Sequence, residues 1–271
     1  MSVSHPELVG SFDVERSGVE ASQAFGERLW WRCPVADDHV WDATVDHRSR
    51  GRGCPFCVGR RVAVSNCLAT THPEIAAQWH PTKNGGLTAW DVVAGTDQKV
   101  WWSCDVAEDH VWEASLHKRT VGRNCPFCAG QRVVRSNCLA TTHPDLAAQW
   151  HPTKNGELTT WDVVAGSNKK VWWLCPVAGD HEWLAAASWR LKGPTCPFCC
   201  NRRVCGSNCM AATDPELARQ LHPTLNGDVT GESVVAGTHK KLWWRCFGTP
   251  THVWEQSGAS RRRGGTSCRF C

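Results

Sequence analysis

Short apolar runs rich in valine and tryptophan recur along the chain and alternate with polar turns. The runs Lys99–Cys104 and Val111–Leu116 have the composition of two β-strands that form a hairpin. Upstream, Pro73–Trp79 predicts a short helix, since proline is tolerated at the first helical position. The Asn84-Gly85 pair that follows is typical of a turn. The pattern therefore predicts small units, each with one short helix and one hairpin.

This pattern repeats with a period of 71 residues, because a cysteine behind a tryptophan doublet recurs at Cys33, Cys104, Cys175 and Cys246. A period that does not drift indicates a tandem array. The first copy is shorter, since His5 and Cys33 are 28 positions apart where His143 and Cys175 are 32 apart. A diverged terminal repeat is expected as a cap of such an array. We place the repeats at residues 1–62, 63–133, 134–204 and 205–271.

Each repeat carries one quartet of cysteine and histidine residues with the spacing of metal ligands. A histidine lies six positions after the first cysteine, and a Cys-x-x-Cys pair follows. The quartets are Cys33, His39, Cys54 and Cys57; Cys104, His110, Cys125 and Cys128; Cys175, His181, Cys196 and Cys199; and Cys246, His252, Cys268 and Cys271. Three thiolates and one imidazole on two short loops suit a closed tetrahedral zinc site. We therefore expect four structural Zn²⁺ ions.

Disulfides are the alternative for these thiols, but a disulfide framework leaves four registered histidines unexplained. The other five cysteines are Cys67, Cys138, Cys200, Cys205 and Cys209. We expect them to be small buried hydrophobic residues, with Cys200 and Cys205 the least explained.

Smaller features predict local backbone structure. Gly59, Gly130 and Asn201 each lie two positions after the second cysteine of a Cys-Pro-Phe-Cys motif, where a tight turn requires a positive φ. Asp214 occupies a helix cap position, where its carboxylate would accept orphan amide hydrogens. The histidines beside prolines, such as His80, are expected to be turn or core residues.

The Trp-Trp-x-Cys, His-x-Trp and Cys-Pro-Phe-Cys signatures resemble the probable zinc-ribbon repeat, a family of unknown function. So does the Ala-Ala-Gln-Trp-His-Pro-Thr-Lys-Asn-Gly segment at 76–85 and 147–156. The resemblance covers almost the whole chain. It implies small α+β zinc-binding modules, that is, four tandem zinc-ribbon or treble-clef-like repeats, each with a short helix, a β-hairpin and two zinc knuckles. Some members are joined to restriction-endonuclease-like domains, which implies contact with nucleic acid. The first loop departs from the family pattern, because residues 36–38 lengthen it.

Several function classes are disfavoured. Four ligands per site leave no open metal position for chemistry, and no recurrent carboxylate and lysine set suits a nuclease, so we expect no enzymatic activity and no small-molecule substrate. No apolar run approaches the roughly 18 residues that a membrane span needs. Residues 1–10 lack the basic start and apolar core of a secretory signal, so we expect a cytoplasmic protein.

Positive charge gathers around the second cysteine pair of each repeat. The formal net charge is only +4, and it falls near zero once thiolates and zinc are counted. Four windows, 42–62, 113–135, 182–204 and 255–271, are nevertheless each positive. The basic side chains that we expect to contact nucleic acid, DNA more than RNA, are Arg48, Arg50, Arg52, Arg60, Arg61, Lys118, Arg119, Arg123, Arg132, Arg190, Lys192, Arg202, Arg203, Arg261, Arg262 and Arg263.

Two alternatives remain open at this point. The arginines could instead offset the negative charge of each Cys3His zinc centre or solvate the loops. The chain could be a zinc-stabilised scaffold that presents tryptophan-rich faces to a protein partner. Neighbours in a strand point to opposite faces, so Trp101 and Trp102 cannot enter the same core, and one of each doublet is expected to be partly exposed.

Overall fold

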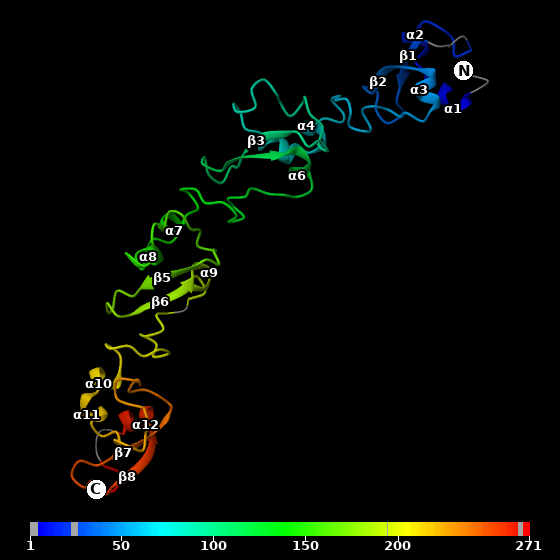
Figure 1. The fold of residues 1–271 in the computed structure, drawn as a ribbon. Coiled ribbons are helices and arrows are strands. Elements are labelled where there is room, and N and C mark those ends of the chain that lie inside the picture. The colour runs from blue at the N-terminus through cyan, green and yellow to red at the C-terminus, as the bar shows by residue number, and fades with distance from the viewer. Residues whose placement is uncertain (1–4, 23–26, 194, 265–267) are drawn as a thin grey trace. The chain divides into compact units, whose positions relative to one another are not determined.

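The computed structural model describes residues 5–22, 27–193, 195–264 and 268–271 (Figure 1). The chain divides into two compact units, Met1–Arg132 and Val133–Cys271, each of which holds two repeats. In each repeat two short helical turns precede a two-stranded antiparallel hairpin, and one short helix follows it. The expected fold of small α+β modules is confirmed.

The elements have the following bounds. The first repeat contains α1 (Pro6–Val9), α2 (Val14–Ser17), β1 (Arg28–Arg32), β2 (Val40–Thr44) and α3 (Val45–Ser49). The second contains α4 (Leu68–Thr71), α5 (Pro73–Ala76), β3 (Lys99–Ser103), β4 (Val111–Ser115) and α6 (Leu116–Thr120). The third contains α7 (Leu139–Thr142), α8 (Pro144–Ala147), β5 (Lys170–Leu174), β6 (Glu182–Ala186) and α9 (Ala187–Arg190). The fourth contains α10 (Met210–Thr213), α11 (Pro215–Ala218), β7 (Lys241–Arg245), β8 (Val253–Ser257) and α12 (Gly258–Arg263).

The hairpins agree with the prediction from valine and tryptophan content. In the β3–β4 hairpin, Trp102 lies opposite Trp112. The second tryptophan of every doublet is fully buried, and its indole N–H donates to a carbonyl of the partner strand, as Trp102 does to Ala114 at 3.0 Å. The first tryptophan is more exposed, at 38% for Trp30. The expected division of each doublet between two faces is confirmed.

The predicted helix over Pro73–Trp79 is too long, because α5 ends at Ala76. The next residues pair with the hairpin instead: the Gln78 carbonyl accepts from the Ser103 amide at 2.8 Å, and Trp79 forms an isolated bridge with Trp102. Edge pairing on β3 satisfies these backbone groups and takes the place of further helical turns. The helices α4 and α6 and their counterparts were not predicted.

Asp214 is the N-cap residue of α11, but its side chain makes no capping hydrogen bond. Its Oδ1 atom accepts instead from Arg262 Nε at 3.2 Å. The capping prediction for Asp214 was therefore wrong, because its carboxylate pairs with the guanidinium of Arg262 on α12. The prediction of positive φ is confirmed at Gly59, Gly130 and Asn201, with φ of 71°, 65° and 57°.

Each core is built on the hairpin. In the first repeat Leu8, Phe12, Trp31, Trp41 and Phe56 belong to one buried cluster. The shortened first repeat keeps the arrangement of the others, since Phe12 bridges to Trp31 as Trp79 does to Trp102. Among the described residues no helix has both the length and the apolarity needed to cross a membrane.

Candidate metal centres and basic surface

The four predicted quartets each come together in space. Within each set the ligand atoms lie within 4.8 Å of one another. In the first repeat His39 Nδ1 lies 3.6 Å from Cys54 Sγ and 3.5 Å from Cys57 Sγ. Cys33 Sγ lies 3.6 Å from Cys57 Sγ. Cys33 directly follows β1 and His39 directly precedes β2, so both lie in the turn of the hairpin. The loop after α3 carries the cysteine pair.

These distances fit the edges of a tetrahedron around zinc. Zn–S bonds of about 2.3 Å and Zn–N bonds of about 2.0–2.1 Å give S···S edges of about 3.8 Å and S···N edges of about 3.5 Å. In the third repeat the Cys175–Cys199 sulfur distance is 3.7 Å, and His181 Nδ1 lies 3.6 Å from Cys196 and 3.4 Å from Cys199. The donor set is thus preformed for four-coordinate zinc with no open position.

The acid–base chemistry of the thiols also fits a cation. Burial, together with hydrogen bonds and charge from the neighbouring thiols, raises the pKa of Cys57, Cys128 and Cys199 to about 12. Three close thiols cannot all ionise unless a positive charge lies among them. A divalent ion supplies that charge and holds all three as thiolates. Each quartet therefore fits one structural Zn²⁺ ion, and the chain has four such sites.

A family model described as a probable treble clef zinc finger domain matches residues 20–60, 75–131, 146–202 and 217–271. These matches cover most of the chain. The chain belongs to this family. A comparison with curated proteins finds no match.

The ligand histidine of the first repeat is held from two sides. The phenylalanine of the Cys-Pro-Phe-Cys motif stacks on the imidazole in the first three repeats, with ring centroids 5.0 Å apart for His39 and Phe56. At the other ring nitrogen, Ser65 Oγ lies 2.9 Å from His39 Nε2. That hydroxyl also donates to Asp38 at 2.6 Å. The chain from Asp38 through Ser65 to His39 fixes the ring orientation that leaves Nδ1 for zinc.

The same arrangement recurs in the third repeat. Ser207 Oγ lies 3.1 Å from His181 Nε2 and donates to Asp180 at 2.6 Å. Hydrogen bonds from Ser207 lower the pKa of Asp180 to about 2. A set of possible metal ligands formed by Asp180, His181 and Cys205 shares its histidine with the zinc quartet, so we assign it to this supporting network. The segment after each of these knuckles is a packed turn, since Ser65 and Ser207 make these contacts.

One arginine in each repeat lies beside the zinc ligands rather than on the surface. Arg119 is 4% exposed and its guanidinium lies 5.3 Å from the Trp102 ring and 5.4 Å from the Trp112 ring. It donates to Gln78 Oε1 at 2.5 Å and to the Arg123 carbonyl. Burial lowers the pKa of Arg119, while the charge of Cys125 and Cys104 raises it. Arg119 therefore offsets the charge of the zinc centre from within the core.

The counterparts of Arg119 are Arg48, Arg190 and Arg261. Arg190 and Arg261 are buried and donate to Gln149 and Gln220, as Arg119 does to Gln78. Arg48 is half-buried between Trp31 and Trp41 and donates to Ser11 Oγ at 3.2 Å. Arg119, Arg190 and Arg261 are buried, so we remove these three from the expected interface, whereas Arg48 is half-buried and lines a pocket beside the second knuckle. The alternative that arginines offset the charge of the zinc centre fits these buried residues, but spacing along the sequence alone does not distinguish a buried arginine from an exposed one.

The remaining predicted basic residues are exposed. These are Arg50, Arg52, Arg60, Arg61, Lys118, Arg123, Arg132, Lys192, Arg202, Arg203, Arg262 and Arg263. Three of these side chains form ion pairs: Arg50 pairs with Asp46, Arg61 with Asp42 and Arg262 with Asp214.

The cysteines outside the quartets divide into two groups. Cys67, Cys138 and Cys209 are buried at the N-caps of α4, α7 and α10, as expected for small hydrophobic residues. Cys205 is half-buried against the third core. Cys200 is exposed, so the expectation of burial was wrong for this residue. It directly follows a ligand cysteine on the outer side of the knuckle.

The histidines beside prolines are turn residues, as expected. His80 Nδ1 accepts from the amides of Thr82 and Lys83, both at 3.3 Å. The exposed tryptophans Trp90 and Trp161, at 57% and 46%, were not singled out by the sequence. Each lies in a turn in which a threonine and an aspartate bond to each other, as Thr88 and Asp91 do at 2.5 Å. A Thr-x-Trp-Asp spacing is the signal that could have identified them.

Proposed function

We propose that this chain is a non-enzymatic tandem treble clef protein that binds nucleic acid through exposed arginines beside its zinc knuckles. The observation that carries the proposal is a repeated arginine turn. After the second ligand cysteine the backbone folds back, and the amides of Arg60 and Arg61 donate to the Pro55 carbonyl at 2.8 and 3.1 Å. Arg202 and Arg203 bond to Pro197 in the same way, at 2.8 and 3.0 Å.

In the second repeat Gln131 and Arg132 occupy these positions and bond to Pro126 at 2.8 and 3.1 Å. An exposed arginine is thus mounted on the same zinc-bound turn in three repeats, at Arg61, Arg132 and Arg203. Zinc fixes the two cysteines that flank the Pro-Phe pair of the turn. The backbone that carries the guanidinium therefore loses little conformational entropy when phosphate binds. Arginine pairs bidentately with phosphate and with guanine edges. The preference for DNA over RNA rests on the resemblance to proteins joined to nuclease-like domains, which is an analogy.

The test is binding of the zinc-loaded chain to duplex DNA, single-stranded DNA and RNA of one sequence at several salt concentrations. We expect affinity to fall steeply with salt, with a slope of about −0.9 per neutralised phosphate on duplex DNA. Changing Arg61, Arg132 and Arg203 together to Gln removes up to three phosphate contacts. The salt slope should therefore become shallower by up to about 0.9 for each contact that is lost. Arg219→Gln is the control, since Arg219 is also exposed and paired with an acidic residue but lies at the C-cap of α11 and not on a knuckle turn. Absence of binding to every probe at low salt would remove the proposal.

A second function, a zinc-stabilised scaffold for a protein partner, is favoured by Trp90 and Trp161. Large exposed tryptophans on braced turns are typical anchors of protein interfaces. This function becomes the better account if the zinc-loaded chain binds no nucleic acid. In either case thiolate ligands are best kept in a reducing compartment, which supports the proposed cytoplasmic location.

A further inference from the structure

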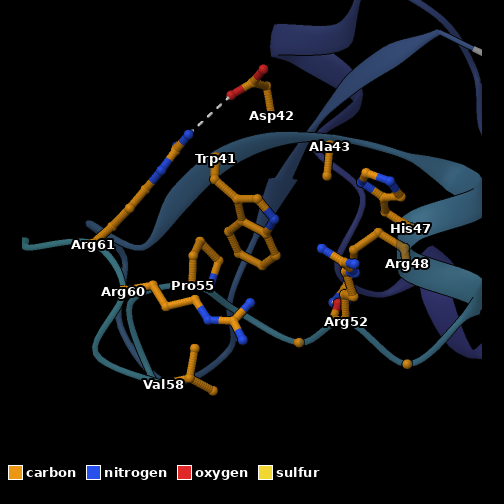
Figure 2. Close-up of a pocket in the computed structure, with 12 residues that line it drawn as sticks. Trp41, Asp42, Ala43, His47, Arg48, Arg52, Pro55, Val58, Arg60 and Arg61 are labelled. Atoms are coloured by element: carbon orange, nitrogen blue, oxygen red, sulfur yellow. Dashed lines mark hydrogen bonds and ion pairs between the residues drawn. The ribbon is translucent and has the colours of Figure 1, made fainter.

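A pocket of about 510 Å³ lies beside the second knuckle of the first repeat. Its lining includes Trp41, His47, Arg52, Pro55, Val58 and Arg60. Figure 2 shows Arg60 and Arg61 on one side of Trp41, and His47, Arg48 and Arg52 on the other. The pocket thus combines cationic walls with an apolar surface.

Some of these charges already have partners. Arg48 lies between Trp31 and Trp41 and offsets the zinc centre. Asp42 pairs with Arg28 at 2.6 Å and with Arg61 at 3.7 Å. Among the described residues, the guanidinium groups of Arg52 and Arg60 pair with no acidic side chain. The pocket therefore has two uncompensated positive charges, and His47 adds a ring nitrogen.

Both arginines stand on fixed turns. The Arg60 amide bonds to the Pro55 carbonyl, and Gly59 before it has the positive φ that this turn requires. The Arg52 amide bonds to the His47 carbonyl at 3.2 Å, and Gly51 before it has φ of 80°. Because the backbone at both arginines is fixed before binding, less conformational entropy is lost when an anion binds.

The chemistry of the lining selects a class of ligand. Two free guanidinium groups match the charge of a phosphomonoester, about −1.5 to −2 at neutral pH, better than the single charge of a phosphodiester. Val58, which is 61% exposed, and Pro55 offer apolar contact to a sugar or base next to that phosphate. The positions of Arg52 and Arg60 correspond to Arg123 and Gln131 in the second repeat and to Pro194 and Arg202 in the third. The first repeat alone among these three has both arginines.

We propose that this pocket binds the terminal phosphate of a nucleic-acid strand, an inference that rests on the proposed function. The chain then has an end-recognition site in its first repeat in addition to the arginine turns that contact internal phosphates. The same chemistry would accept a free nucleoside monophosphate.

The test compares strands of one sequence that carry a phosphate at the 5′ end, at the 3′ end or at neither end. We expect the zinc-loaded full chain to bind one phosphorylated strand about tenfold more tightly than the unphosphorylated strand. The double change Arg52→Gln and Arg60→Gln should abolish that difference. Arg202→Gln, on the matching turn of the third repeat, should leave it intact. Zinc content measured on each variant confirms that the fold is retained.

Two results overturn the inference: equal binding of all three strands, or a preference that survives the double change. Equal binding of the strands leaves the proposed function standing and removes only the pocket. If the chain binds none of the strands, a titration with adenosine monophosphate tests the pocket by itself. Binding of the mononucleotide that depends on Arg52 and Arg60, without binding of any strand, supports the pocket as a phosphomonoester site and removes the proposed function.

Discussion

At the scale of single residues, the buried arginine links the zinc centre to the hairpin core. Arg119 is stacked between two tryptophans and bonded to Gln78 and the Arg123 carbonyl. Three thiolates, one imidazole and Zn²⁺ carry a net charge of −1, and a cation held in the core offsets it. Removal of the Arg119 guanidinium leaves the charge of the zinc centre uncompensated. It also leaves Gln78 Oε1 and the Arg123 carbonyl without this donor.

We therefore expect Arg119→Gln to lower the free energy of unfolding of the second repeat by about 2–4 kcal/mol. Urea unfolding of the zinc-loaded chain measures this. Arg123→Gln is the matched control, because the Arg123 side chain is exposed, and it should change stability by less than about 0.5 kcal/mol. Equal stability of the Arg119 variant and the control would show that the buried cation does not stabilise the centre.

Ser65 is a second residue with a defined part, since it connects His39 Nε2 to the Asp38 carboxylate. Loss of such an orienting group typically weakens metal binding about 10–100-fold. We expect Ser65→Ala to release one of four zinc ions earlier in a competition titration with a chromogenic chelator. Ser49→Ala is the control, because the Ser49 hydroxyl donates to the Asp46 carbonyl of its own helix. An unchanged titration for Ser65→Ala would contradict the orienting role.

At the scale of elements, the turn after each knuckle depends on a left-handed residue. Gly59 has φ of 71°, and an added Cβ would lie 3.6 Å from Val93 Cγ2, an ordinary contact. The cost of Gly59→Ala is therefore backbone strain alone, about 1–2 kcal/mol. Gly53→Ala, where φ is not positive and the Cβ meets nothing within 4 Å, should be nearly neutral. Thermal unfolding compares the two, and equal midpoints would refute the requirement for a left-handed residue.

Much of each element could be predicted from the sequence. The hairpin strands follow from valine and tryptophan content, and the ligands follow from four quartets in register. The end of α5 could not be predicted, because Gln78 and Trp79 exchange helical bonds for pairing with β3. Arg119 is buried because α6 places its side chain against Trp102 and Trp112 of the hairpin. The distribution of charges along the sequence does not predict this packing.

At the scale of the whole molecule, zinc supplies folding free energy that the small cores lack. Structural zinc contributes about 10–16 kcal/mol per site in small peptides, whereas a whole domain is stable by about 5–15 kcal/mol. We expect a strong chelator to unfold the protein, with loss of its circular dichroism signal. Restoring zinc should return the signal. A spectrum that does not change after verified zinc removal would show that the repeats fold without metal.

The four zinc centres are tested most directly by the metal content of the freshly purified protein, measured by elemental analysis together with a count of free thiols after denaturation. Four Cys3His centres and five unligated thiols require four zinc ions per chain and 17 free cysteines. Far fewer than four zinc ions, with the quartet cysteines joined as disulfides, would contradict the assignment of these centres.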